Sequence, residues 1–116
     1  MTDPTTPEDA LPIALPEGAA MADYQRYIFE LEALHGWLDN DAARNCFLMG
    51  EEVGELFGAV RDHERRGEQA REAVAEEIVD ILNYLLAIAN RLDIDVETAF
   101  RQKNARNQRR SWQGEP

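Results

Sequence analysis

The sequence reads EEVGE over residues 51–55 and EEIVD over residues 76–80, and these two acidic stretches decide the fold. Each lies inside an apolar run with helical spacing, and helical residues three or four positions apart project from the same face. The pairs that project together are Glu52 with Glu55 and Glu77 with Asp80. Like charges one turn apart destabilise a bare helix by about 0.2–0.5 kcal/mol per pair. Neither stretch has a Lys or Arg one turn further along the chain to relieve this repulsion.

Gly67 lies almost midway between the two stretches, within a polar segment at residues 65–71. If the chain reverses there, both stretches lie about a dozen residues from the turn, roughly 18 Å along each helix at about 1.5 Å per residue. Two antiparallel helices would then bring four or more carboxylates to one level. Clustered hard oxygen anions favour a divalent cation, and we expect Mg²⁺ or Mn²⁺.

The composition describes one acidic domain. The chain has 116 residues and a net charge of −11, which argues against a nucleic-acid polymer as its main partner. Cys46 is the only cysteine, so an internal disulfide and a cysteine zinc site are excluded, and we expect it to be buried. No apolar run approaches the roughly 18 residues that cross a bilayer, and the acidic, proline-rich N-terminus does not resemble a signal peptide. We therefore expect a cytoplasmic protein without a membrane partner.

The helical spacing predicts an all-α domain of four helices. Residues 1–20 hold four prolines and no periodicity, so they are predicted to be a flexible tail, followed by a domain at 21–112 and a short tail at 113–116. The predicted helices run from about Ala22 to His35, Ala42 to Arg66, Glu72 to Leu92, and from a cap at Asp95 to about Ser111. A core of this size is expected to need a second subunit.

Two features of the middle helices predict close neighbours. In the second helix, an apolar stripe is formed by Cys46, Met49, Val53, Phe57 and Val60, and a glycine ridge by Gly50, Gly54 and Gly58. Each glycine costs a helix about 1 kcal/mol relative to alanine, so the ridge predicts a backbone that approaches closely. The third helix carries an apolar stripe wide enough to predict burial on more than one side.

The last helix concentrates positive charge. Its basic residues are Arg101, Lys103, Arg106, Arg109 and Arg110. Lys103, Asn107 and Arg110 have helical spacing and share a face that suits a run of phosphates. The alternative is a solvated basic helix without a ligand.

The ExxE at Glu52 and Glu55 and the ExxD at Glu77 and Asp80, with 21 residues between them, resemble the signature of the MazG-like all-α nucleotide pyrophosphohydrolases. Their surroundings are similar too. Residues 49–56 resemble the family's second helix, residues 76–84 its third, and residues 93–100 with the following Lys-x₃-Asn-x₂-Arg its closing segment. The resemblance covers roughly residues 24–110.

The resemblance implies a four-helix core that assembles into dimers, or into tetramers as dimers of dimers, with sites shared between subunits. It implies Mg²⁺-dependent cleavage of nucleoside triphosphates, ribo- or deoxyribo-, to the monophosphate and pyrophosphate, as nucleotide-pool house-cleaning. Carried over by position, the metal ligands would be Glu52, Glu55, Glu77 and Asp80, and the phosphate-binding residues Lys103, Asn107 and Arg110.

One branch of the family, similar to deoxycytidine triphosphatases, suggests a nucleoside subsite. There a Trp precedes an Arg-Asn pair by the offset that separates Trp37 from Arg44 and Asn45, and a tyrosine follows the ExxD acid by one turn, as Tyr84 does. This resemblance implies that Trp37 and Tyr84 border the base, with Arg44, Asn45 and Asn83 nearby. Asp41 stands where that branch has a His, so the base stays open.

The mechanistic hypothesis places one or two Mg²⁺ ions between the carboxylates and the phosphates, where they polarise a water for in-line attack. Glu51, or whichever cluster carboxylate does not bind metal, would accept the water proton, so the catalytic set comprises Glu51, Glu52 and Glu55. Two alternatives remain open. One is a non-catalytic helical oligomer whose acids are solvated, and the other a pyrophosphatase of the same fold that acts on another nucleotide such as phosphoribosyl-ATP.

Overall fold

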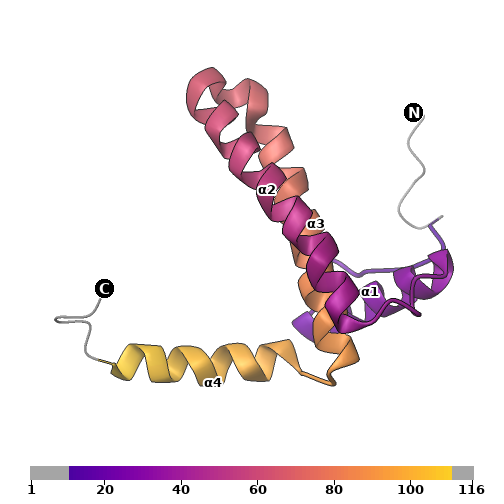
Figure 1. Ribbon diagram of the computed structural model, residues 1–116. Helices are drawn as coiled ribbons and strands as arrows, with labels where there is room; N and C mark the ends of the chain where they lie inside the picture. The colour runs from indigo at the N-terminus through magenta and orange to yellow at the C-terminus, as the bar shows by residue number, and fades with distance from the viewer. Residues whose placement is uncertain (1–10, 111–116) are drawn as a thin grey trace.

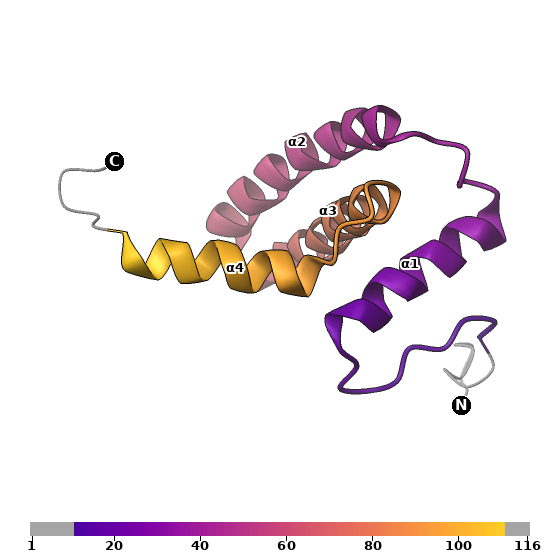
Figure 2. The ribbon, with the colours of Figure 1, turned by 90° about the horizontal axis from the view of Figure 1, so that it is seen from below.

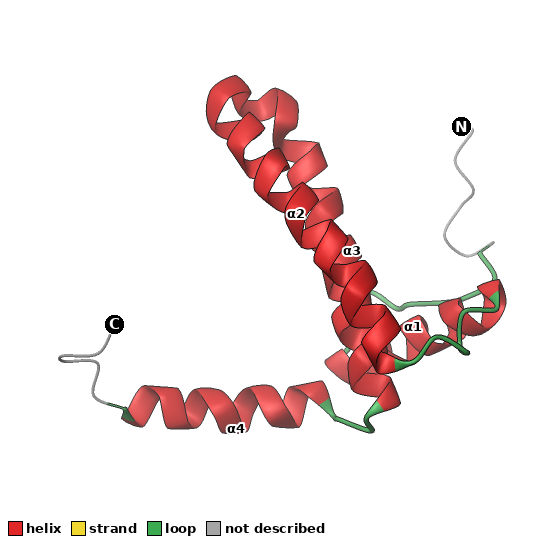
Figure 3. Ribbon diagram, in the orientation of Figure 1, coloured by secondary structure: helices red, strands yellow, loops and turns green. Residues whose placement is uncertain are grey.

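A computed structural model describes residues 11–110 of the chain, and the secondary structure of this part consists of helices joined by loops, without strands (Figure 3). Its elements are α1 (Met21–His35), α2 (Ala42–Arg66), the 3₁₀ helix η2 (Gly67–Ala70), α3 (Arg71–Arg91) and α4 (Val96–Arg109). The all-α prediction is confirmed, and every helix end lies within two residues of its predicted place. Residues 1–10 of the predicted tail at residues 1–20, and the whole of the predicted tail at 113–116, lie outside the described residues.

The helices α2 and α3 form a long antiparallel hairpin (Figure 1). The side chain of Asp41 caps the start of α2 by accepting a hydrogen bond from the Arg44 amide at 2.8 Å. Gly67 ends α2 with φ +69° and ψ −139°, a conformation that strains any residue with a Cβ, and η2 then leads into α3. The predicted chain reversal at Gly67 is therefore confirmed.

The face of α2 that packs against α3 is not the predicted apolar stripe. The inward-facing residues of α2 include Asn45, Leu48 and Glu52, whereas Phe57 is 74% exposed and Cys46 is also exposed. The prediction of a buried cysteine is therefore wrong, and the apolar stripe is not buried at Phe57. The inward side of α2 instead carries polar residues that belong to the site.

The glycine ridge of α2 lies on the open side of the hairpin. A Cβ placed on Gly50 or Gly54 would meet nothing within 4 Å, and one on Gly58 would meet only the Arg61 side chain at 3.8 Å. Within one chain no neighbouring backbone approaches these glycines, so the close approach stays a prediction for an assembly of chains. The outer side of α3 is equally open, because Ile78, Val79 and Leu85 are all exposed. Burial of α3 on more than one side is therefore not achieved within one chain.

The helix α1 lies beside the end of the hairpin that is remote from η2 (Figures 1 and 2). There Ile28 packs with Leu86 and Ala87 of α3 in a small hydrophobic core, which Leu31 and Val96 extend. Since this core occupies only one end, the half of the hairpin near η2 has no third helix over it. The chain is accordingly extended, with a radius of gyration of 17.3 Å, against about 13 Å for a compact domain of 100 residues.

A glutamine fixes where α4 starts. The Gln25 amide donates to the Asn90 side-chain oxygen at 3.0 Å and to the Ile94 carbonyl at 2.9 Å, and its oxygen accepts from the Val96 amide at 3.0 Å. Asp95 caps α4 by accepting from the Thr98 amide at 3.0 Å. Beyond this junction α4 projects away from the hairpin (Figures 1 and 2).

Replacing Gln25 by Ala should lower the free energy of unfolding by about 1–3 kcal/mol, because it leaves polar groups at the α3–α4 junction without partners. Urea denaturation followed by circular dichroism, at a fixed protein concentration, measures the change. Gln102→Ala on the exposed surface of α4 is the control and should change the free energy by less than about 0.5 kcal/mol. Equal effects of the two substitutions would contradict the assigned role of Gln25.

Candidate metal and nucleotide site

Three carboxylates meet across the α2–α3 hairpin. Glu52 and Glu55 of α2 and Glu77 of α3 each offer an oxygen, and these oxygens all lie within 4.8 Å of one another. The helical spacing puts Glu52 and Glu55 on one face, and the reversal at Gly67 brings Glu77 opposite them. The three side chains form what we call the acidic cluster.

The electrostatics of the acidic cluster centre on Glu77. Its Oε1 is buried and, while the carboxylates are ionised, no donor among the described residues reaches it. The pKa of Glu77 is raised to about 7, first because protonated Glu77 can form a hydrogen bond with Glu52, then because burial and the charge of Glu55 disfavour its ionised form. A proton can therefore relieve the repulsion, and so can a cation.

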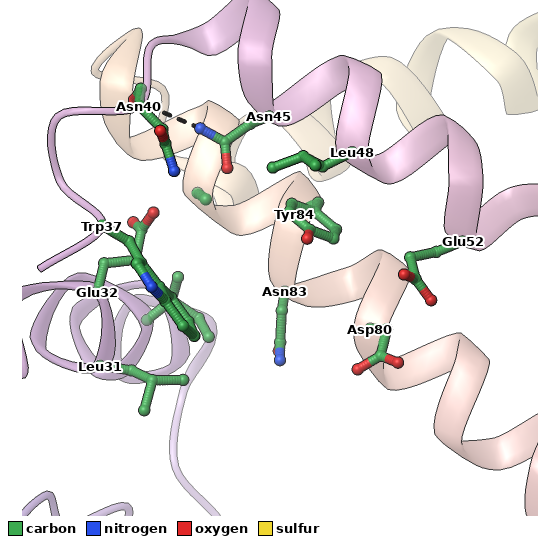
Figure 4. Close-up of a pocket in the computed structure, with 12 residues that line it drawn as sticks. Leu31, Glu32, Trp37, Asn40, Asn45, Leu48, Glu52, Asp80, Asn83 and Tyr84 are labelled. Atoms are coloured by element: carbon green, nitrogen blue, oxygen red, sulfur yellow. Dashed lines mark hydrogen bonds between the residues drawn. The ribbon is translucent and has the colours of Figure 1, made fainter. Parts of the chain in front are cut away.

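The donor set of the acidic cluster fits a divalent cation. All three side chains offer hard carboxylate oxygens, which Mg²⁺ and Mn²⁺ prefer, and the unpaired Glu77 oxygen lacks a positive partner. Asp80, the fourth predicted ligand, is not among these mutually close groups. It lies one turn further along α3, and Figure 4 shows its carboxylate near that of Glu52.

A cavity of about 410 Å³ adjoins the acidic cluster and lies between α1, the loop at residues 36–41, α2 and α3. Glu52 belongs to both the cluster and the cavity wall. The cavity is lined by Ile28, Leu31, Glu32, Trp37, Asn40, Asn45, Leu48, Glu52, Asp80, Asn83, Tyr84 and Ala87 (Figure 4). One end of the cavity is therefore acidic and the other apolar and amide-bearing.

The apolar end has an aromatic wall. Trp37 is 49% exposed and stacks on His35, with ring centroids 4.5 Å apart and an angle of 24° between the rings. Tyr84 of α3 lies deeper in the cavity (Figure 4). Its pKa is raised, mainly by burial and then by the negative charges of Glu52, Asp80 and Glu51, so its hydroxyl keeps its proton at neutral pH. A flat, partly exposed indole and a neutral phenol suit an aromatic ligand.

Asn45 presents a fixed acceptor to the cavity. It is only 3% exposed, and its Nδ2 donates to the Asp41 carbonyl at 2.9 Å and to the Asn40 carbonyl at 3.5 Å. Because these bonds orient the amide, its oxygen faces the cavity (Figure 4). The geometry suits a ligand that carries an N–H donor at its edge.

Several predicted residues do not line the cavity. Glu51 and Arg44 are exposed at its margin, and both influence the pKa of Tyr84 electrostatically. Lys103, Asn107 and Arg110 belong to the α4 segment, which points away from the hairpin (Figure 1). Within one chain, the structure thus does not bring the predicted phosphate-binding residues to the acidic cluster.

The sequence interpretation missed six of the residues that line the cavity, namely Ile28, Leu31, Glu32, Asn40, Leu48 and Ala87. Glu32 gave a signal that could have been used, because it follows Ile28 by one turn and so falls on the core-facing side of α1. A carboxylate at such a position requires a partner, which is Arg91 of α3.

The match to a known protein family covers the hairpin and α4. The model of the MazG nucleotide pyrophosphohydrolase domain matches residues 43–113. The chain belongs to this family. The acidic cluster lies within the matched residues, and it agrees with the general dependence of MazG domains on divalent metals. The match leaves out α1 and Trp37, and no curated protein matches the chain. Across residues 11–110, no helix is long and apolar enough to span a membrane.

The raised pKa of Glu77 predicts a pH-dependent stability. Its pKa rises from 4.5 to about 7 on folding, so its stabilising contribution is complete below about pH 4.5 and is lost as the pH rises through about 7. Glu77→Gln removes this titration. In the presence of EDTA, the urea midpoint of Glu77→Gln should increase relative to that of the unmodified protein as the pH rises from about 5 to about 8.

The control for this experiment is Glu72→Gln, an exposed acid at the start of α3. It should show no such pH-dependent gain. If the difference in urea midpoint between Glu77→Gln and the unmodified protein stays constant over the same pH range, the assignment of a raised pKa to Glu77 is contradicted.

Proposed function

We propose that this MazG-family protein hydrolyses nucleoside triphosphates, ribo- or deoxyribo-, to the monophosphate and pyrophosphate with Mg²⁺, for which Mn²⁺ can substitute. The observation that carries the proposal is the continuity of the acidic cluster with the aromatic, amide-bearing cavity through Glu52. Such a site can hold a base at one end and a metal-bound phosphate chain at the other. The physiological role would be nucleotide-pool house-cleaning in the cytoplasm.

The acidic cluster, together with Asp80, would hold the cation, which supplies charge neutralisation and polarises the attacking water when bound. Hydrolysis joins the water oxygen to a phosphorus of the α–β anhydride, and the bond to the leaving phosphate oxygen breaks. The proton that the water loses needs a carboxylate outside the metal-ligand set. Glu51 is our candidate acceptor, since it precedes Glu52, is exposed, and is close enough to Tyr84 of the cavity wall to influence its pKa.

The nucleoside would enter the cavity between Trp37 and Tyr84. Asn45 would accept a hydrogen bond from the base, which an exocyclic amino group or a ring N–H can donate. Asn83, half-buried on the wall beside Tyr84, lies between the aromatic end and Asp80, where it can reach the sugar or the first phosphate. This division agrees with a cavity whose aromatic rings lie at one end and whose carboxylates lie at the other, apart from Glu32, which is paired with Arg91.

We further propose that a second copy of the chain completes the site, in a homodimer or a tetramer. Phe47 and Phe57 are 75% and 74% exposed, and helical spacing puts them on the α2 face that carries Gly50 and Gly54. An open apolar face without Cβ atoms suits close packing by another helix. Lys103, Asn107 and Arg110 would then reach the phosphates of a neighbouring subunit. The net charge of −11 leaves no nucleic-acid polymer among the proposed partners.

The activity is tested with a panel of ribo-, deoxyribo- and modified nucleoside triphosphates, assayed for pyrophosphate release with Mg²⁺ or Mn²⁺. Replacing Glu52, Glu55 or Glu77 by Ala should lower kcat about 10²-fold or more, because the metal loses a ligand, while the helix content stays unchanged. The exposed Glu72→Ala is the matched control. If no substrate is turned over and no metal raises the melting temperature, the protein is a non-catalytic oligomer instead.

Sharing of the site is tested by complementation. Glu55→Ala and Lys103→Ala should each be inactive alone. After mixed refolding, hybrid dimers would contain one intact site, and random pairing would restore roughly a quarter of the activity. Formation of hybrids without any recovery would show that each chain builds its own site.

A further inference from the structure

A buried ion pair joins α1 to the end of α3. Arg91 and Glu32 have side chains that are only 14% and 7% exposed. The guanidinium binds the carboxylate with two parallel hydrogen bonds, from Nη1 to Oε1 at 3.0 Å and from Nη2 to Oε2 at 2.8 Å. Both partners are thus fixed in orientation, as bidentate pairs of this kind are.

The remaining donors of Arg91 hold the loop at residues 36–41. Nη2 also donates to the carbonyls of Trp37 at 3.1 Å and Leu38 at 3.5 Å, and Nε donates to the carbonyl of Asn40. Nη1 additionally donates to the Ala87 carbonyl at 2.9 Å. Every N–H of the guanidinium is therefore used, an arrangement that the compact ammonium group of a lysine cannot reproduce.

This loop carries part of the cavity wall, and Arg91 supplies the side-chain hydrogen bonds to its Trp37 and Leu38 carbonyls. The loop contains no helix, and its two ends are held by other bonds, from the Gly36 amide to Ala33 and from the Asn45 side chain to the Asn40 and Asp41 carbonyls. Its remaining backbone hydrogen bonds run from the Trp37 amide to Glu32 and from the Asn40 amide to Trp37. The indole of Trp37 is half exposed, so packing alone does not hold it. Arg91 does not line the cavity, whereas Glu32, Trp37 and Asn40 do. Arg91 therefore acts on the cavity only through these groups.

We propose that Arg91 is a positioning residue that holds the loop at residues 36–41 so that Trp37 forms the wall against which the nucleoside base stacks. It also neutralises Glu32, whose charge would otherwise face an anionic nucleotide. The proposal rests on the proposed function. It further assigns a role in nucleoside binding to Glu32 and α1, which the family match at residues 43–113 leaves out.

The test compares Arg91→Lys with the unmodified protein on a nucleotide and on inorganic tripolyphosphate, which has no base. We expect KM for the nucleoside triphosphate to rise about five- to hundredfold, the range that loss of base–aromatic stacking gives, with kcat changed less than about twofold. Competitive inhibition by tripolyphosphate should stay unchanged, because phosphate and metal binding do not involve the loop. If Arg91→Lys weakens the binding of the nucleoside triphosphate and of tripolyphosphate equally, the proposal is overturned and Arg91 has only a general structural role.

A second measurement needs no activity. Trp37 and Trp112 are the only tryptophans, so in a Trp112→Phe background the fluorescence reports Trp37 alone. Arg91→Lys should raise the acrylamide quenching constant about twofold and lower the anisotropy, with helix content preserved. Arg26→Lys is the matched control. It exchanges an α1 arginine whose side chain is 44% exposed and whose partners are Asp23 and Glu30, so neither quantity should change.

If Arg91→Lys does not fold, Glu32→Gln is the alternative variant, because it keeps the size of the buried side chain. It should raise KM and Trp37 quenching by less than Arg91→Lys, since the carbonyl bonds of Arg91 remain. Unchanged quenching in the folded variants would overturn the proposal. A parent protein that hydrolyses no nucleotide would defeat the proposed function instead, and the fluorescence result would still decide whether Arg91 holds the loop.

Discussion

The repulsion among carboxylates at the centre of the α2–α3 hairpin is the constraint on which the rest of the structure depends. Oxygens of Glu52, Glu55 and Glu77 lie within 4.8 Å of one another, and the pKa of Glu77 is raised by its hydrogen bond with Glu52, by burial and by Glu55. A hairpin built only for stability would place apolar residues here. Because the fold instead holds three anions together, it is organised around a cation, as expected for a MazG domain.

Two polar contacts bind α1 to α3 and thereby shape the other end of the site. Arg91 reaches Glu32 and the loop that carries Trp37, and Gln25 binds Asn90 and the start of α4. The hydrophobic core between these contacts is small, with Ile28, Leu86 and Ala87 at its centre. Directional hydrogen bonds, more than apolar area, therefore set where α1 lies relative to the hairpin. These hydrogen bonds also set the shape of the aromatic end of the cavity.

Much of the surface of the hairpin does not pack against any other segment of residues 11–110. The outer face of α2 presents two phenylalanines and a glycine ridge, the outer face of α3 is apolar, and α4 extends alone with its basic residues. Such surfaces are costly in water, and they are arranged along helices that a second copy could cover. The proposed assembly of copies would account in one step for the extended shape, the exposed glycines and the separation of α4 from the acidic cluster.

The sequence by itself determined the helices, the reversal at Gly67 and the pairing of the two acidic stretches, because caps, glycine and helical spacing act locally. Only the tertiary structure decided that Cys46 and Phe57 stay exposed, since the inward face of α2 carries Asn45 and Glu52 and leaves these apolar side chains outside. It also decided that Arg91 binds Glu32 and where α4 points. These depend on contacts between residues more than fifty positions apart, which no local pattern encodes.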